Sequence, residues 1–233
     1  MTESLQLARP NRLTGPIVFS DGIGSAGKRM LGHIVASLSS VEKMSHHFVF
    51  DYVAALHWLK KISDDGAITY LQTEADLQLY QQFLGRDVNF RPRDTSGVWA
   101  NPGWGRYLKR LFSPEGDDVL KRLGADSPVL HEATHDGLRS ASLFFRAFGE
   151  RLKIVHILRN PSDLISDLYR RGFGSRVGSD PREFQLTLAG PVSPVHIYMA
   201  DVAGEVSSWS ALDFSAETVA RSLSANLLGY KAL

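Results

Sequence analysis

A glycine-rich segment near the start of the chain has the residue types and spacing of a phosphate-binding loop. Residues 22–29 read GIGSAGKR. Gly22, Gly24 and Gly27 match the spacing G-x-G-x-x-G of dinucleotide-binding loops, and Gly22 through Lys28 match G-x-x-x-x-G-K of phosphate loops. Glycines let the backbone approach a phosphate closely, and the first N–H groups of the following helix then face it. The segment therefore predicts the binding of a nucleotide phosphate.

The two cations that end this segment help to separate the two templates. Lys28 and Arg29 lie at the expected start of a helix, where the positive end of the helix dipole makes a cation unfavourable. Their presence is explained if they contact a bound anion that carries more charge than a pyrophosphate diester. This favours a phosphate loop, although Asp51 stands where an acidic residue would meet an adenosine ribose. Nucleoside triphosphatases need Ser or Thr directly after the lysine to hold magnesium, and Arg29 takes that place. We therefore expect a protein that binds a phosphate without magnesium. In the alternative interpretation, the glycines serve only to let the strand and the helix pack closely, and the two cations are exposed to solvent.

The elements around this loop follow from hydrophobic periodicity. The run PIVFS predicts a strand, and KRMLGHIVASL has its apolar residues at helical spacing. Further along, strands are expected at HHFVFD, PVLHEATHD and LKIVHILRN. Helices are expected over residues 52–62, 67–85, 117–124, 138–150, 161–172 and 215–230, with a hairpin about Gly190-Pro191. Strands that alternate with helices indicate a parallel sheet covered by helices.

The predicted fold is a three-layer α/β/α arrangement with a central, mainly parallel sheet, similar to phosphate-loop nucleotide-binding proteins and carrying a helical insertion. We expect one domain over residues 1–233, with a core at about 16–172. Residues 86–128 form an elaborated connection, and residues 173–233 form the hairpin and the last helix.

Two motifs in the second half of the chain add a family resemblance. Thr134-His135 ends one expected strand, and Arg159-Asn160-Pro161-Ser162-Asp163 ends another and leads into a helix. In type and order these motifs, with the loop FSDGIGSAGKRML as the 5′-phosphosulfate loop, resemble the sulfotransferases that use 3′-phosphoadenosine-5′-phosphosulfate (PAPS). The resemblance covers roughly residues 16–172.

This resemblance implies an enzyme that transfers a sulfuryl group from PAPS to a hydroxyl or amine acceptor, and a carbohydrate is one such acceptor. It implies the following donor-binding residues: Gly22, Gly24, Ser25, Ala26, Gly27, Lys28 and Arg29 at the 5′ end, and Arg159 with Ser166 at the 3′-phosphate. Ser25 stands where the family usually has a cation. The family's serine lies eight residues after the arginine, where this chain has Asp167 instead of Ser166. The family's C-terminal basic loop has RRGFGSR as its nearest substitute.

Sulfuryl transfer requires a base for the acceptor proton and a cation for the charge that develops on the leaving oxygen. His135 suits the first task and Lys28 the second. Glu132 is a competing base, because some related enzymes that act on carbohydrates use a glutamate. The letters HEATH also match the zinc-protease motif H-E-x-x-H, but that motif needs a helix and a strand is expected here, so no metal is predicted. His46 and His47 are expected at a strand end rather than in a site.

Composition sets the remaining expectations. The 233 residues carry a formal charge of +1, which does not favour nucleic acid as a partner. The sequence contains no cysteine, so a cytoplasmic setting is expected, and no run approaches the ~18 apolar residues of a membrane span. Nothing sets an oligomeric state. A kinase of a nucleotide or small molecule, a non-catalytic nucleotide-binding module and, last, a Rossmann oxidoreductase are the rival functions.

Overall fold

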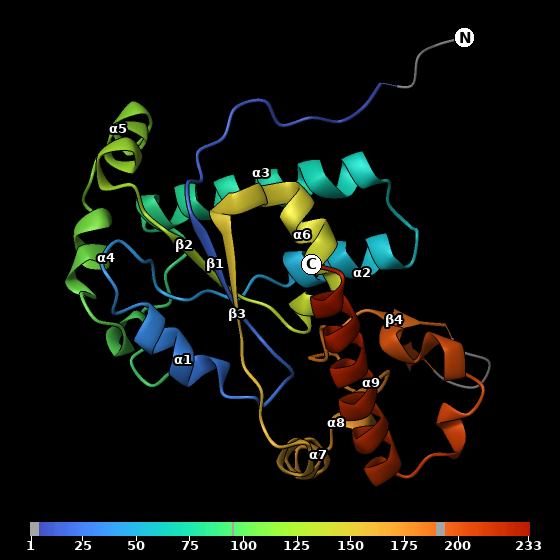
Figure 1. Cartoon of the computed structure of the whole chain (residues 1–233). Helices are drawn as coiled ribbons and strands as arrows, with labels where there is room; N and C mark the ends of the chain where they lie inside the picture. Colours follow the sequence, from blue (N-terminus) through green and yellow to red (C-terminus); the bar gives the residue numbers. More distant parts are fainter. Residues whose placement is uncertain (1–4, 95, 190–193) are drawn as a thin grey trace.

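A three-stranded parallel sheet lies at the centre of an α/β fold (Figure 1). The computed structural model describes residues 5–94, 96–189 and 194–233. Strand β1 (Ile17–Asp21) lies between β2 (Leu130–Ala133) and β3 (Leu152–His156), in the order β2-β1-β3. Its first residue pairs with the first residue of both neighbours, so all three strands end at the same edge. This α/β architecture is consistent with the predicted three layers.

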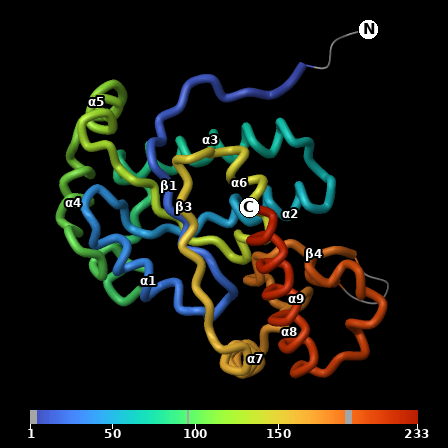
Figure 2. Tube along the Cα trace, in the orientation of Figure 1, coloured from blue at the N-terminus to red at the C-terminus, as the bar shows by residue number. Residues whose placement is uncertain are grey.

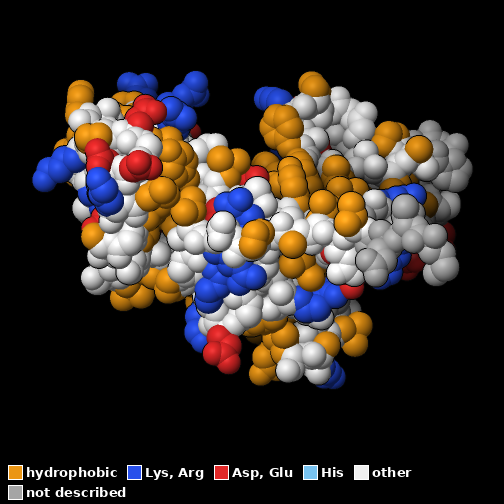
Figure 3. Space-filling view, turned by 90° about the horizontal axis from the view of Figure 1, so that it is seen from above, with side chains coloured by type: hydrophobic (Ala, Val, Ile, Leu, Met, Phe, Trp, Pro, Cys, Tyr) orange, Lys and Arg blue, Asp and Glu red, His pale blue; other side chains and the backbone are white. Residues whose placement is uncertain are grey.

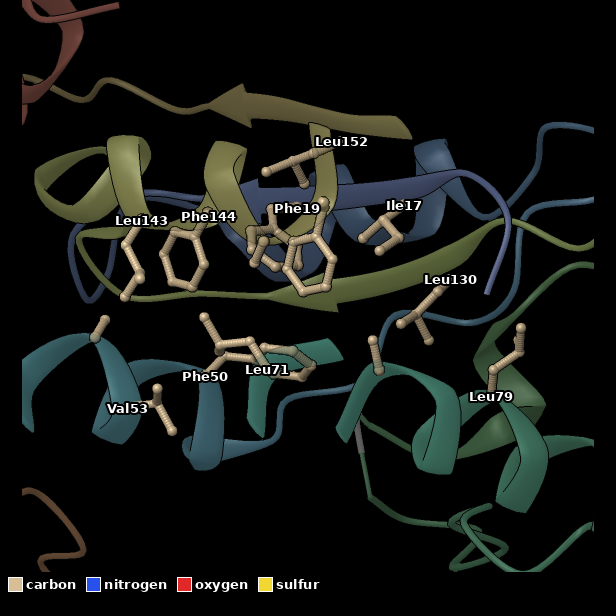
Figure 4. Packing of buried hydrophobic residues seen from close by; sticks show 14 of the residues in the cluster. Ile17, Phe19, Phe50, Val53, Leu71, Leu79, Leu130, Leu143, Phe144 and Leu152 are labelled. Carbon is tan, nitrogen blue, oxygen red and sulfur yellow. The ribbon is translucent and has the colours of Figure 1, made fainter. Parts of the chain in front are cut away.

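The main hydrophobic core lies between the sheet and three helices, α2 (Phe48–Trp58), α3 (Asp64–Leu84) and α6 (Ala141–Phe148). Phe19 of β1 is fully buried and makes edge-to-face contacts with Phe50 and Phe144. Figure 4 shows these rings facing one another between the strands and the helices. Burial of such large aromatic side chains is a principal source of stability, at about 25 cal/mol for each Å² of apolar surface.

A second core connects the glycine loop to the C-terminal part of the chain. Ile23 and Ala26 of the loop pack with Leu164 and Leu168 of α7 (Pro161–Arg170) and with Val219 of α9 (Ala211–Lys231). Figure 2 shows α8 (Phe173–Arg176, orange) and α9 (red) beside α7, with the C-terminal end of α9 near α6. Packed side chains of α7 and α9 therefore hold the glycine loop in place.

The remaining described α-helices are α1 (Lys28–Val35), which follows the loop, and α4 (Gly105–Arg110) and α5 (Asp117–Asp126) in the connection between α3 and β2; five short 3-10 helices lie elsewhere in the described residues. None of the described helices combines the length and apolar character that a membrane crossing needs. Figure 3 shows the face on which the strands begin, where basic, acidic and hydrophobic side chains are interspersed.

Most expected elements are confirmed, with bounds that shift by a few residues. Gly85 ends α3 in the left-handed conformation, with φ 74°, and Pro161 is the first residue of α7. The strand expected at LKIVHILRN ends at His156. The C-terminal hairpin is present as antiparallel β4 (Thr187–Leu188) and β5 (Val195–His196), and its expected turn at Gly190-Pro191 lies outside the described residues.

One expected element is wrong, and one expected helix begins at an earlier residue. HHFVFD is not a strand, because α2 begins at Phe48 and buries Phe50, Val53 and Ala54 at helical spacing. The segment beside β2 comes earlier in the chain, where Val41 and Ser45 form isolated parallel bridges. The last helix also begins earlier than residue 215, because Ser210 and Asp213 form its capping box.

Candidate functional site

Three candidate segments converge because parallel strands end at the same edge of a sheet. Strand β1 runs into the glycine loop, β2 into Thr134-His135, and β3 leads through Ile157 and Leu158 to Arg159. Ligands of open parallel sheets bind outside this edge. The sequence thus places its three sets of predicted site residues together.

Asp21, the last residue of β1, fixes the geometry of this edge. Its carboxylate is fully buried and accepts hydrogen bonds from Thr134 Oγ1 (2.9 Å), Gly137 N (2.6 Å), Leu138 N (3.1 Å) and His156 Nδ1 (2.6 Å). Burial opposes its ionisation, but the hydrogen bonds outweigh burial and lower the pKa of Asp21. Thr134 therefore serves the scaffold, while its neighbour His135 is left to face the site.

The loop itself has the backbone of a close-approach turn. A Cβ on Gly22, at φ 143°, would lie 2.8 Å from Ile157 O, so only glycine fits there. Ser25 adopts φ 71°, a left-handed conformation that is uncommon for a residue with a Cβ. Its buried Oγ has no hydrogen-bond partner among the described residues. A buried hydroxyl without a partner is costly, and an oxygen of a bound anion would satisfy it.

Lys28 points back under the loop. Its residue is only 9 % exposed, and its Nζ donates to Gly22 O and lies 3.4 Å from Ile23 O. Burial lowers the pKa of Lys28, against the opposing effect of the nearby carboxylates of Asp21, Asp136 and Asp51. The loop thus holds a desolvated cation whose hydrogen-bond partners, within the part of the chain that the structure describes, are two carbonyl oxygens.

Arg159 contacts the loop but is already paired. Its Nη1 donates to Ser25 O at 2.9 Å and to Asp167 Oδ2 at 2.7 Å. The predicted partner Ser166 is exposed, and its carbonyl accepts from Arg170 Nε at 3.4 Å. The structure therefore brings Asp167, and not Ser166, to the arginine.

His135 lies in a compact cluster with His46 and Asp51. Asp51 Oδ1 accepts from the backbone N–H of His135 at 2.9 Å. Asp51 Oδ2 lies 3.3 Å from His135 Nδ1 and 3.2 Å from His46 Nε2, and these two ring nitrogens are 3.1 Å apart. Burial opposes ionisation of Asp51, but the hydrogen bonds from His135 and His46 lower its pKa to about 2. Burial, aided by the charge of Lys28, lowers the pKa of His135.

An Asp51 carboxylate that holds Nδ1 of His135 leaves Nε2 as the nitrogen available to take a proton. The side chain of His135 is 35 % exposed, so it remains accessible. The arrangement is that of a general base held in position by a carboxylate.

Glu132 lies elsewhere. Its side chain is fully buried, and it accepts from His47 Nδ1 at 2.9 Å, while His47 Nε2 contacts Asp87 Oδ2 at 2.7 Å. Burial raises the pKa of Glu132. Glu132 thus belongs to an internal polar network, separate from the cavity next to His135. The neighbouring His131, on β2, contacts Ser20 Oγ at 2.8 Å inside the sheet.

A cavity of about 270 Å³ joins the loop to His135. Gly24, Ser25, Asp51 and His135 line one side of it. Other lining residues come from α2, from the end of α7, from α8 and α9, and from the hairpin with the turn that follows it, and they include Phe48, Tyr52, Arg171, Phe173, Arg176, His196 and Tyr198. The C-terminal part of the chain therefore contributes half of the candidate site, which the sequence had assigned mainly to residues 16–172.

Asp136 connects this C-terminal part to the site. Its carboxylate accepts from Ser222 Oγ at 2.7 Å and from Asn226 Nδ2 at 3.0 Å, both on α9. Asn226 Oδ1 in turn accepts from Arg139 N at 3.1 Å. Three buried polar side chains thus fix α9 against the turn that carries His135.

Comparisons with protein-family models, with curated proteins and with solved structures find no match for this chain. The site must therefore be judged on its own geometry.

Sequence reasoning missed three of these residues or misplaced their role. Asp21 ends β1 and Asp136 lies three residues after the end of β2, and each precedes a glycine, in Asp21-Gly22 and Asp136-Gly137, which is the signal that was available. His46 was assigned to a strand end, but it lies against His135, 89 residues away in the chain. No local pattern indicates a contact across that distance.

Proposed function

We propose that this protein is a PAPS-dependent sulfotransferase that acts on a small hydroxyl or amine acceptor. One observation carries the proposal: the glycine loop, which is contacted by Lys28 at Gly22 O, borders through Gly24 and Ser25 the same cavity as the Asp51–His135 pair. An anion-binding loop and a positioned base at one cavity are the two parts that group transfer to a hydroxyl requires.

In this reaction the acceptor oxygen forms a bond to sulfur while the bond between sulfur and the bridging phosphate oxygen breaks. His135 Nε2 takes the acceptor proton, and Asp51 holds the ring through Nδ1 and the backbone N–H. Lys28 neutralises the leaving phosphate oxygen, for which its ammonium must leave the carbonyl of Gly22. Arg29, directly after the lysine, offers no hydroxyl for magnesium, and this favours a donor that reacts without that metal.

Aromatic and cationic residues of the cavity wall suit the acceptor. Phe48 and Tyr52 stack with ring centroids 5.6 Å apart, and Arg171 and Arg176 lie on the same wall. A small acceptor that combines a flat or apolar body with an anionic group fits these residues. The lack of cysteine in the sequence supports a cytoplasmic setting.

A second candidate, transfer of a phosphoryl group from a nucleotide without a 3′-phosphate, is favoured by one contact. Arg159, the proposed ligand of the 3′-phosphate, is held by Asp167 at 2.7 Å. A carboxylate at this place repels a phosphate. The two candidates therefore differ in the phosphate that the nucleotide carries at its 3′ position.

The deciding experiment compares nucleotides in thermal melts without magnesium. We expect 3′-phosphoadenosine-5′-phosphate to raise the melting temperature more than ADP, ATP or NAD, because Arg159 and the loop each add a contact to a phosphate. A ligand at 100 times its Kd stabilises the folded state by about 2.7 kcal/mol. A larger response to ADP or ATP would favour the phosphotransferase, and equal responses to all four would remove the argument for the 3′-phosphate.

A further inference from the structure

The His46–Asp51–His135 cluster has a geometry that proton acceptance alone does not require. Three potential ligand atoms, His46 Nε2, Asp51 Oδ2 and His135 Nδ1, lie 3.1–3.3 Å from one another. It is the one group of at least three such side chains found among residues 5–94, 96–189 and 194–233. An Asp–His pair is sufficient to orient a base, so the second histidine has no part in that role.

The distances between these atoms are those of ligands around a single metal ion. Nitrogen and oxygen ligands about 2.1 Å from zinc lie about 3.4 Å apart at tetrahedral angles and about 3.0 Å apart at octahedral ones. The three observed separations, from 3.1 to 3.3 Å, fall between these two values. Almost no rearrangement of the side chains is needed to coordinate an ion.

The directions of the side chains agree with the distances. Nδ1 of His135 makes hydrogen-bond geometry with both His46 Nε2 and Asp51 Oδ2, so its in-plane direction falls between them. If both nitrogens were protonated, two N–H groups would converge on one carboxylate oxygen and face each other at 3.1 Å. A cation just out of the plane of the triangle, about 2.1 Å from each of the three atoms, removes this conflict, because both nitrogens then present lone pairs.

The three ligands are held in place by other contacts. Asp51 Oδ1 is fixed by the backbone N–H of His135 at 2.9 Å, and the ring of His46 packs on Phe48 with centroids 4.4 Å apart. The ligand side chains are 14–35 % exposed, and Asp51 and His135 line the cavity. Three ligands from the protein therefore leave coordination positions open toward the cavity, as in sites where a metal meets water or a substrate.

We propose that His46, Asp51 and His135 form a binding site for one divalent first-row transition metal ion of the zinc type. Two imidazoles and one carboxylate suit Zn²⁺, Co²⁺ or Fe²⁺ and disfavour Mg²⁺, which prefers oxygen ligands. The site goes beyond the proposed sulfuryl transfer and does not depend on it. A metal ion on Nδ1 of His135 keeps the ring proton on Nε2, so metal binding and proton acceptance are alternative states of this imidazole.

Calorimetric titration with Zn²⁺ in the absence of nucleotide tests the site, after treatment of the protein with a chelator. We expect one ion for each chain and, with Co²⁺ as a second probe, visible absorption bands of low-coordinate cobalt. His46→Ala should weaken Zn²⁺ binding more than about 100-fold, because loss of a mere hydrogen-bond partner of a ligand already costs about 10- to 100-fold. Asp51→Asn should weaken it as well.

The matched control is His57→Ala. His57 Nε2 lies 2.6 Å from Asp64 Oδ1, so it is also a histidine paired with an aspartate, but no third ligand from the described part of the chain completes the group. This variant should bind Zn²⁺ like the unmodified chain. Thermal melts with 3′-phosphoadenosine-5′-phosphate and chelator, run in parallel, report the nucleotide site separately. The absence of Zn²⁺ binding, or equal binding by the His46→Ala and unmodified chains, would overturn the metal site and leave the proposed function standing.

Discussion

Arg159 and Asp167, eight residues apart, form an ion pair of 2.7 Å at the edge of the glycine loop, and the same Nη1 of Arg159 also donates to Ser25 O at 2.9 Å. Asp167 is shared with Arg170, whose Nη2 contacts Oδ1. The arginine is thus positioned beside the loop, and its Nη1 is already paired with a carboxylate. Hydrogen bonds from Arg159 lower the pKa of Asp167, so this carboxylate is charged at neutral pH.

Replacement of this carboxylate tests whether Arg159 contacts a 3′-phosphate. Asp167→Ser should strengthen binding of 3′-phosphoadenosine-5′-phosphate by about 10- to 100-fold relative to ADP, because a charge-assisted hydrogen bond contributes about 1.5–3 kcal/mol. Calorimetry with both nucleotides measures the ratio. Asp163→Asn is the control, since Asp163 lies 4.0 Å from Arg159 Nε and is 62 % exposed. An unchanged ratio in Asp167→Ser would place Arg159 away from the 3′-phosphate.

Lys28 and His135 should act on turnover rather than on nucleotide affinity. Lys28→Met keeps the volume of a residue that is 9 % exposed and removes the charge that stabilises the leaving oxygen. We expect the rate of sulfuryl transfer from PAPS to fall about 100-fold or more, with a much smaller change in nucleotide affinity. His135→Ala should behave likewise, because general base catalysis contributes about 10²- to 10⁴-fold.

The control for this pair is Lys153→Ala, an exposed lysine on β3. Steady-state rates and separate binding measurements distinguish the two effects. If Lys28→Met lowered nucleotide affinity and left the turnover of the bound complex unchanged, the lysine would stabilise the bound nucleotide and the transition state equally and would not accelerate the reaction.

Two buried histidines should make the stability of the fold depend on pH between about 6.5 and 4. Burial lowers the pKa of His131 to about 4, and burial together with the charge of Arg139 lowers that of His196 to about 4. In this window the unfolded chain binds at His131 and His196 the protons that the folded chain does not, so their contribution to the free energy of unfolding is fully present above pH 6.5 and is lost as the pH decreases toward 4.

Each histidine accounts for a loss of about 3 kcal/mol once the pH reaches 4, at about 1.4 kcal/mol for each unit of pKa shift. Denaturant unfolding at several pH values measures the slope. His131→Gln should reduce it by about one proton between pH 6 and 5. A slope that stays the same in this variant would show that His131 does not resist protonation.

The sequence predicted the loop and the elements around it because their signals are local. Glycine spacing, a preceding apolar strand and a following amphipathic helix all fall within residues 17–35, and Pro161 marks the start of α7 without any tertiary information. HHFVFD failed as a strand because a short apolar run satisfies strand and buried helix equally well. Asp51, expected at the end of that strand, instead lies in the first turn of α2 and still reaches the site.

The choice between the candidate bases was beyond local patterns. Alternation along a strand predicts the faces of His131, Glu132 and His135 only while the strand continues, and β2 ends at Ala133. Glu132 is removed from the cavity by His47, which lies 85 residues away in the chain. Such partners are set by the tertiary fold, which periodicity and spacing do not report.

The hydrogen bonds of Asp21 also have a kinetic consequence. Its partners Thr134 and His156 are separated from it by 113 and 135 residues, so its carboxylate gains them only after very long loops have closed. Until then its charge retains water, and withdrawal from that water without these partners is unfavourable. Formation of the central sheet and maturation of the loop edge are therefore expected late in folding and in one step, so that chains which reach the native sheet also possess an ordered binding edge.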